Sequence, residues 1–298
     1  MDEGFFCFYR QNKGGTFMKK IAIIGAGSMA EAFISGILEN GLIDKKNIWI
    51  TNNSNQERLA NLEKRYGVRT TYHLNELLDQ ADIVMLAMKP KDVATAIQSI
   101  REHLTEQMLV VSVLAGVSMD TIETLARMPL AIVRSMPNTS AAVGKSATAV
   151  AINHRVTQQQ LETTKNLFDT VGLASFVEEE QLDAVTGLSG SGPAYIYYLI
   201  EAMEKSAVEV GLEKDMASAL IVQTLLGAAE MVKNSSKSST QLRKEVTSPG
   251  GTTEAGIRVL EEHGVQQAFI SCIKAATAQS KKMGAELSAK LQTADQPS

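Results

Sequence analysis

The sequence has little of what disulfide scaffolds and metal centres are built from. Only two cysteines occur in 298 residues, Cys7 and Cys272, and they form no CxxC pair. Such a chain offers neither a disulfide framework nor a thiolate zinc site. The four histidines stand in four separate segments, with no HxH or HExxH spacing. The sequence therefore favours neither a metal site nor a histidine-based catalytic triad.

Long apolar runs and an excess of basic charge are also missing. No uninterrupted apolar run reaches the ~18 residues of a membrane span, which predicts a protein without a membrane segment and makes the cytoplasm the default location. The net charge is −4, from 29 basic and 33 acidic residues. Proteins that bind nucleic acid normally carry a basic stripe, so a nucleic-acid partner is disfavoured. At roughly 150 residues per domain, the length predicts two domains.

The first seventeen residues differ from the rest of the chain. Two acids, Asp2 and Glu3, precede the short apolar patch 5–8, whereas a secretory signal begins with basic residues and continues with a longer apolar run. We expect residues 1–17 to be a disordered extension, with a small partner-docking tag as the alternative. The folded domain is then expected to begin at Met18.

Strand and helix patterns alternate from Met18 to about Phe176. Apolar runs typical of buried strands occur at 21–24, 48–50, 82–87, 109–113 and 130–133, and helical spacing lies between them. Strict alternation predicts an α/β fold with a mostly parallel, doubly wound sheet.

The pattern becomes helical after Phe176. The segment 217–232 is apolar almost all round, and a helix of that kind is buried on all sides. A helical domain of ~100 residues can hardly cover such a helix alone, so we expect a second subunit to cover it.

A dinucleotide fingerprint follows the first apolar run. Gly25-x-Gly27-x-x-Ala30 has the G-x-G-x-x-A form. The first glycine permits a tight turn, the second lets a pyrophosphate approach the backbone, and the small third residue lets the helix pack on the strand. The motif follows a predicted strand and opens a predicted helix, and this context favours a cofactor site over a plain glycine turn. The helix amides from Ser28 onward would face the phosphates.

The end of the second strand bears on which nicotinamide cofactor is used. It reads Thr51-Asn52-Asn53-Ser54, where enzymes that use NAD usually place Asp or Glu on the ribose hydroxyls. With no acid to repel a 2′-phosphate, the uncharged donors predict NADP. A loop that only caps the next helix is compatible with both cofactors.

Two more segments follow predicted strands at the edge where ligands of open α/β sheets bind. Ala87-Met88-Lys89-Pro90 follows the third strand, and the segment 134–139 follows a later one. Pro90 suits the first turn of a helix. The alternative interpretation of Lys89 is a charged side chain that is exposed to solvent and has no role in binding.

Two glycine-rich turns open helices in the second half of the chain, at 188–193 and at 248–254. Free backbone amides at such a turn can bind a carboxylate or a phosphate, although plain helix capping is the alternative. Both turns are small and polar, which predicts that they share one small-molecule pocket.

These motifs resemble the Δ1-pyrroline-5-carboxylate reductase family. The matching stretches run from about Met18 to Gly284: GAGSMAEA from residue 25, LAMKP from 86, VVSVLAGVS from 110, RSMPNT from 134, DAVTGLSGSGPAY from 183 and TSPGGTTEAGI from 247. The resemblance implies a Rossmann-type NADP-binding domain at 18–178 and an all-α dimerisation and substrate domain at 179–298. It also implies a homodimer or larger homo-oligomer. The implied reaction is NAD(P)H-dependent reduction of (S)-1-pyrroline-5-carboxylate to L-proline, the last step of proline biosynthesis from glutamate.

The resemblance also implies roles for individual residues. Cofactor-binding residues would be Gly25, Ala26, Gly27, Ser28, Met29, Ala30, Asn52, Ala87, Met88, Lys89, Pro90, Ala115 and Asn138. Substrate-binding residues would be Gly250, Gly251, Thr252, Thr253 and Glu179. The turn 248–253 would hold the substrate carboxylate, with Thr253 and Ser248 as catalytic residues and the Thr253 hydroxyl aimed at the ring nitrogen.

The chain departs from the family pattern at Asn53, Thr252, Ser146 and Glu245, and two rival functions remain. Relatives often carry Arg where this chain has Asn53, so the strength of the preference for NADPH over NADH stays open, and relatives usually have Ala where Thr252 stands. A β-hydroxyacid dehydrogenase would need a lysine on the helix after the first glycine-rich turn, but none occurs before Lys205. A non-catalytic nucleotide-binding paralogue is disfavoured by the intact turn at 248–253.

Overall fold

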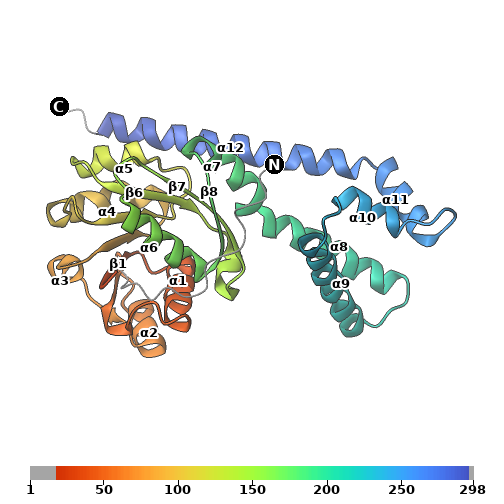
Figure 1. Ribbon diagram of the computed structural model, residues 1–298, viewed down its shortest axis with the longest axis horizontal. Helices are drawn as coiled ribbons and strands as arrows, with labels where there is room; N and C mark the ends of the chain where they lie inside the picture. The colour runs from red at the N-terminus through yellow and green to blue at the C-terminus, as the bar shows by residue number, and fades with distance from the viewer. Residues whose placement is uncertain (1–17, 295–298) are drawn as a thin grey trace.

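The amino-terminal half of the chain forms one eight-stranded sheet (Figure 1). The computed structural model describes residues 18–294, so the expectation for residues 1–17 lies outside the described residues. The strands lie in the order β3-β2-β1-β4-β5-β6-β7-β8. Their bounds are β1 Ile21–Ile24, β2 Ile48–Thr51, β3 Arg69–Thr70, β4 Ile83–Leu86, β5 Leu109–Ser112, β6 Ala131–Met136, β7 Ser146–Ile152 and β8 Gly172–Phe176.

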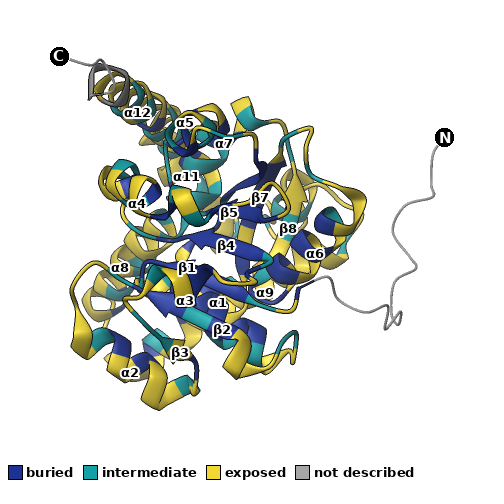
Figure 2. Cartoon of the chain, turned by 90° about the vertical axis from the view of Figure 1, so that its left-hand side faces the viewer, coloured by how far each residue is buried: buried dark blue, intermediate teal, exposed yellow. Residues whose placement is uncertain are grey.

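Alternate residues of the strands build two cores, one on each face of the sheet. In β1, Ile21 and Ile23 belong to the core under α1, α2 and α6, whereas Ala22 and Ile24 belong to the core under α3, α4 and α5. A strand covered on both faces needs a continuous apolar run, which is why no polar residue interrupts β1 or β4. Figure 2 shows these strands buried between the helices. The helices are α1 Ser28–Glu39, α2 Gln56–Tyr66, α3 Leu74–Leu78, α4 Val93–Ile100, α5 Met119–Ala126 and α6 Gln158–Asp169.

The last two strands run against the other six. β6 pairs with β7 antiparallel, and β7 pairs with β8 parallel. The nine residues 137–145 between β6 and β7 hold only the short helix η4 (Thr139–Val143), and a parallel return needs a crossover of a dozen or more residues. The alternation of sequence patterns predicted the mostly parallel sheet and did not predict this reversal.

The second half of the chain is helical and extends away from the sheet (Figure 1). Its elements are η5 Glu179–Gln181, α7 Leu182–Val185, the π-helical turn η6 Thr186–Gly190, α8 Gly192–Glu209, α9 Lys214–Asn234, α10 Ser239–Glu245, α11 Thr252–Glu262 and α12 Val265–Ala294. α8 begins beside the first half and leads away from the sheet, α9 packs against α8 as a hairpin, and α12 returns along the molecule to the first half.

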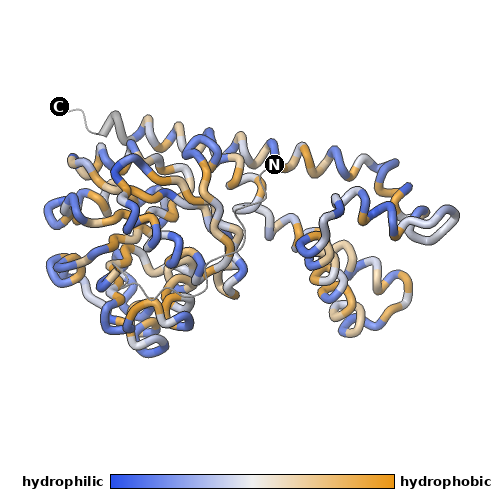
Figure 3. The backbone as a smooth tube through the Cα atoms, viewed as in Figure 1, coloured by the Kyte–Doolittle hydropathy of each residue, from blue (hydrophilic) through white to orange (hydrophobic). Residues whose placement is uncertain are grey.

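Most of the helical half is uncovered. In α9 only Ala217 and Ile221 are buried, and in α11 no residue is. Apolar residues follow α8 and α9 along their length (Figure 3). By length and composition, α9 could cross a membrane, and the same properties suit a helix that another protein subunit covers.

The carboxyl-terminal part of α12 packs closely on the first half. The Ser280 hydroxyl donates a hydrogen bond of 2.6 Å to Asp183 of α7. A Cβ on Gly284 would lie 3.2 Å from the Gly116 carbonyl oxygen, and a Cβ on Gly187 would lie 2.3 Å from the Thr277 hydroxyl. These small residues let α12 approach both the loop after β5 and the turn η6.

Candidate active site

The dinucleotide fingerprint has the backbone geometry that its sequence predicts. Gly25 has φ +110°, and a Cβ there would lie 2.5 Å from backbone atoms of Ala87, so only glycine fits. At Gly27, which precedes α1, no atom lies within 4 Å of where a Cβ would be. No side chain caps the first turn of α1, whose free amides can bind an anion. The residues present therefore fit a dinucleotide pyrophosphate.

The other proposed cofactor segments lie at the same edge of the sheet as the fingerprint. Ala87, Ala115 and Asn138 follow β4, β5 and β6, which are parallel to β1 and to one another. The structure thus brings together residues 25–30, 87–90, 115 and 138, which we call the cofactor edge. Pro90 opens the 3-10 helix η2 (Pro90–Asp92), and Lys89 before it is exposed.

Asn138 joins the cofactor edge to the helical half. Its side chain is 8% exposed. The Nδ2 group donates to the Ser189 carbonyl at 3.0 Å, and Oδ1 accepts from the Ser140 amide at 3.1 Å. Ser189 belongs to the π-helical turn η6, and such turns occur frequently at functional sites. A second η6 carbonyl, of Gly187, accepts from the Tyr195 hydroxyl at 3.1 Å.

A cleft of about 460 Å³ lies beside Asn138 and η6. Its lining is mainly apolar. The residues around it are Asn138, Ser140, Leu188, Ser189, Gly192, Pro193, Tyr195, Ile196, Tyr197, Phe269 and Ile273. The first glycine-rich turn thus opens α8 next to the cofactor edge, with Pro193 in the first turn of the helix.

Asn52 lies at the carboxyl end of β2, as the sequence predicts, and its side chain orders the loop there. Its Oδ1 accepts from the Asn55 amide at 2.9 Å and from the Tyr72 hydroxyl at 3.0 Å. Asn55 in turn caps α2 by accepting from the Arg58 amide at 2.8 Å. The helix-capping alternative therefore holds for Asn55, while Asn52 sets the shape of the loop.

The second glycine-rich turn, residues 248–253, opens α11. Gly250 has φ +72°, and the Gly251 amide donates to the Ser248 carbonyl at 3.0 Å. No side chain caps the first turn of α11, where Thr252 and Thr253 are exposed. The sequence reasoning missed Glu254, whose carboxylate accepts from the Gly250 amide at 2.7 Å. An acid in the first turn of a helix was the signal that could have found it.

The two glycine-rich turns do not meet within one subunit. η6 packs against the first half, whereas the turn before α11 lies at the opposite end of the molecule (Figure 1). One subunit alone therefore does not bring the two turns together, and the pocket that the sequence predicts for them stays a prediction. The turns are separated because α8 and α9 lead away from the sheet and the 30 residues of α12 lead back. A helix of that length spans roughly 45 Å.

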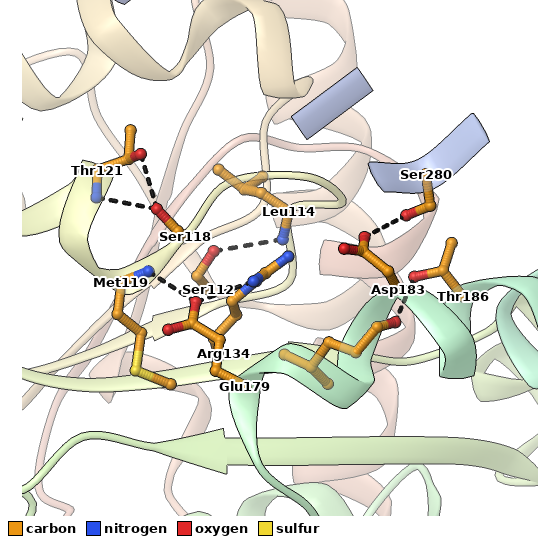
Figure 4. A network of polar contacts seen from close by, with 11 residues as sticks. Ser112, Leu114, Ser118, Met119, Thr121, Arg134, Glu179, Asp183, Thr186 and Ser280 are labelled. Atoms are coloured by element: carbon orange, nitrogen blue, oxygen red, sulfur yellow. Dashed lines mark hydrogen bonds and ion pairs between the residues drawn. The ribbon is translucent and has the colours of Figure 1, made fainter. Parts of the chain in front are cut away.

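Glu179 is engaged inside the first half of the molecule (Figure 4). Its Oε1 accepts from the Met119 amide at 2.9 Å and from Arg134 Nη1 at 2.8 Å. The Arg134 side chain is only 10% exposed. The carboxylate thus ties η5 to β6 and α5, and its role at the substrate stays a prediction.

Comparisons with known proteins cover both halves of the chain. The family model described as pyrroline-5-carboxylate reductase dimerisation matches residues 179–283. The model described as NADP oxidoreductase coenzyme F420-dependent matches residues 20–116. Pyrroline-5-carboxylate reductase 2 of Bacillus subtilis is 51% identical over 257 residues, which are 86% of this chain and 92% of that protein.

Solved structures agree with this result over nearly the same length. A pyrroline-5-carboxylate reductase from Coxiella burnetii superposes with a TM-score of 0.82 at 37% identity, covering 89% of this chain and 98% of that one. The pyrroline carboxylate reductase of Plasmodium falciparum with NADP bound superposes with a TM-score of 0.81 at 28% identity, covering 91% and 100%.

Proposed function

The chain belongs to the pyrroline-5-carboxylate reductase family, and we propose that its cofactor edge and its turn 248–253 form one active site where two subunits meet. The enzyme reduces (S)-1-pyrroline-5-carboxylate to L-proline with NAD(P)H, the last step of proline biosynthesis from glutamate. The observation that carries the proposal is the distance between the two parts of the site within one subunit (Figure 1). We divide the chain into a cofactor domain, 18–178, and a helical domain, 179–298.

The cofactor domain binds the dinucleotide along the cofactor edge. The open face at Gly27 and the uncapped amides of α1 receive the pyrophosphate, because they combine close backbone approach with the positive end of the helix dipole. Residues 87–90 and Ala115 line the cofactor, and Asn138 lies near the nicotinamide. Asn52 lies near the adenosine ribose phosphate. The reduced nicotinamide supplies the hydride for the C=N bond.

The helical domain binds the substrate at turn 248–253. Gly250, with its positive φ, and the free amides at the start of α11 form a concave site for the substrate carboxylate. Glu254 holds this turn in shape through the Gly250 amide. The hydroxyls of Ser248 and Thr253 face the ring, and Thr253 forms a hydrogen bond with its nitrogen. The chain contributes to catalysis mainly by holding C5 of the imine in one orientation.

A second copy of the chain covers the helical domain. The match to the dimerisation model includes all of α8 and α9, whose large apolar residues are exposed in one subunit. We assign the apolar surface of α9 to this subunit contact rather than to lipid. The net charge of −4 disfavours a nucleic-acid partner, and we place the enzyme in the cytoplasm.

Mixed dimers test whether the site spans two subunits. Gly27→Asp places a carboxylate where the pyrophosphate binds, and the fold tolerates it because the space is open. Thr253→Ala weakens the other part of the site. In an assay of NADPH oxidation with pyrroline-5-carboxylate, Gly27→Asp alone is expected to be nearly inactive, and Thr253→Ala alone is expected to lose roughly 10- to 100-fold in activity.

When the two variants are co-expressed, half of the randomly formed dimers are mixed. Each mixed dimer has one intact site of two, so about one quarter of the wild-type activity should return. If each site lay within a single subunit, no mixed dimer would hold an intact site and no activity would return.

A further inference from the structure

A guanidinium lies at the ribose end of the cofactor edge, and the sequence reasoning gave it no role. Arg58, in the first turn of α2, sends its side chain toward α1. Its Nε donates to the Ala26 carbonyl at 2.8 Å, between the two fingerprint glycines, and its Nη2 pairs with Glu31 at 2.5 Å. Arg58 therefore contacts the fingerprint directly.

The backbone places Arg58 at the corner where the adenosine ribose of a dinucleotide lies in this fold. The Gly25 amide donates to the Thr51 carbonyl at 2.9 Å, which joins the fingerprint to the end of β2. Asn55, next to Asn52 in the loop after β2, caps the turn of α2 that holds Arg58. The end of β2, the start of α2 and the fingerprint thus surround one corner. Figure 2 shows α1 and α2 beside the strands β1 and β2.

One carboxylate, Glu31, is shared by two guanidinium groups beside the fingerprint. Glu31 pairs with Arg58 and with Arg65, and it accepts from the Tyr66 hydroxyl at 3.0 Å. Partial burial acts to raise the pKa of the Glu31 carboxyl, but the hydrogen bonds from Arg58 and Tyr66 and the two guanidinium charges hold it below its usual value. Two arginines against one carboxylate leave a surplus positive charge. Arg58 Nη1 makes no hydrogen bond within the described part of the chain, and the side chain is 30% exposed.

We propose that Arg58 binds the 2′-phosphate of NADP(H) and thereby sets the preference over NAD(H), an inference that rests on the proposed function of the cofactor edge. A planar guanidinium fixed by Ala26 and Glu31 is pre-organised to donate to phosphate oxygens. Relatives often carry an arginine at position 53, where this chain has the uncharged Asn53. Arg58 supplies the positive charge for the 2′-phosphate in its place. Glu31 positions it and does not contact the phosphate.

Arg58→Gln tests the proposal, with Arg65→Gln as the matched control. Arg65 shares Glu31, but its side chain is 69% exposed and, unlike Arg58, it forms no hydrogen bond with the fingerprint backbone within the described residues. Charge-assisted hydrogen bonds of this kind correspond to roughly 10- to 100-fold in binding. We expect Arg58→Gln to lower kcat/KM for NADPH by about that factor and to lower kcat/KM for NADH far less, so that the preference ratio collapses. Arg65→Gln should change that ratio less than about threefold.

A binding measurement tests the role of Arg58 at the 2′-phosphate without depending on the reduction of pyrroline-5-carboxylate. In calorimetry, adenosine 2′,5′-bisphosphate should bind Arg58→Gln much more weakly than it binds the wild type, and 5′-AMP should bind both alike. Equal losses with NADPH and NADH would show a structural role and overturn the proposal, as would an equal loss in Arg65→Gln. If the wild type fails to reduce pyrroline-5-carboxylate with either cofactor, the proposed reaction is wrong, and the bisphosphate titration still decides the role of Arg58.

Discussion

The two halves of the chain differ in how much of their apolar surface one subunit covers. The cofactor domain buries Phe33, Phe168 and the isoleucines of β1 and β2 in its two cores. In the helical domain Tyr198 is 77% exposed and Leu226 57%. One half thus has its own cores, whereas the other becomes covered only when a second copy packs against it. If the active site spans two subunits as proposed, cofactor binding needs only one folded subunit, whereas substrate binding needs the assembled dimer.

The strongest test of this comparison is to break the subunit contact. Leu226→Glu places a charge on the exposed face of α9, and a charge buried at an interface without a partner is costly. We expect monomers by light scattering and a loss of activity of at least about 100-fold. NADP⁺ should still bind, because the cofactor domain has its own cores.

The matched control is Val143→Glu. Val143 is an exposed apolar residue of the cofactor domain, at 73%, and lies outside the region matched by the dimerisation model. This variant should keep its mass and activity. A dimeric and active Leu226→Glu would contradict the dependence of the helical domain on a second copy.

The next largest effect is expected at turn 248–253. Thr253→Ala keeps the backbone amides that we propose bind the carboxylate, and it removes the hydrogen bond that we propose for the ring nitrogen. One such donor can contribute about 3 to 4 kcal/mol in a transition state. Because water can replace it here, we expect a loss of roughly 10- to 100-fold in kcat.

Two conservative variants define the role of the Thr253 hydroxyl. Thr253→Ser should retain most of the activity, and Thr252→Ala should change little, since relatives usually carry Ala there. NADPH should bind all three variants like the wild type. Wild-type turnover in Thr253→Ala would exclude the hydroxyl from the reaction.

The same contrast explains how far the sequence predicted the structure. Local patterns predicted the strands β1, β2, β4, β5 and β6 and the fingerprint. A strand that is buried on both faces needs a continuous apolar run, and a tight turn at a pyrophosphate needs glycines at 25 and 27, so both requirements appear within a few residues of sequence. The antiparallel return of β7 depends on the length of one loop and was not predicted.

The relation between the two glycine-rich turns could not be predicted from local patterns either. Both turns open helices, as expected, but their separation depends on how α8, α9 and α12 leave the sheet and return to it (Figure 1). Contacts between single polar side chains could not be predicted from the sequence either. No periodicity indicates that Glu179 pairs with Arg134, or that Arg58 reaches Ala26.

Glu179→Gln should mainly affect the stability of the cofactor domain. The pair with Arg134 is mostly buried, with side chains 28% and 10% exposed, and removing one partner leaves the other charge without compensation. We expect the free energy of unfolding to fall by about 1 to 3 kcal/mol, measured by urea denaturation. A large rise in KM for pyrroline-5-carboxylate with unchanged stability would instead support the predicted role at the substrate mouth.

The smallest effect is expected from Glu31 and appears only as a dependence on pH. Its carboxyl has a folded pKa below the usual value, because the hydrogen bonds and charges of Arg58, Tyr66 and Arg65 outweigh the effect of partial burial. A lowered folded pKa contributes stability that is fully present above the unfolded value of about 4.3 and is lost as the pH falls through the folded value. Thermal unfolding of wild type and Glu31→Gln should therefore differ most near pH 7, and the difference should shrink as the pH is lowered from about 5 to 3. Glu57→Gln, an exposed carboxylate on the same helix as Arg58, serves as the control and should show no such trend. A difference between wild type and Glu31→Gln that stays constant over this range would mean that the ionised carboxylate does not stabilise the corner around Arg58.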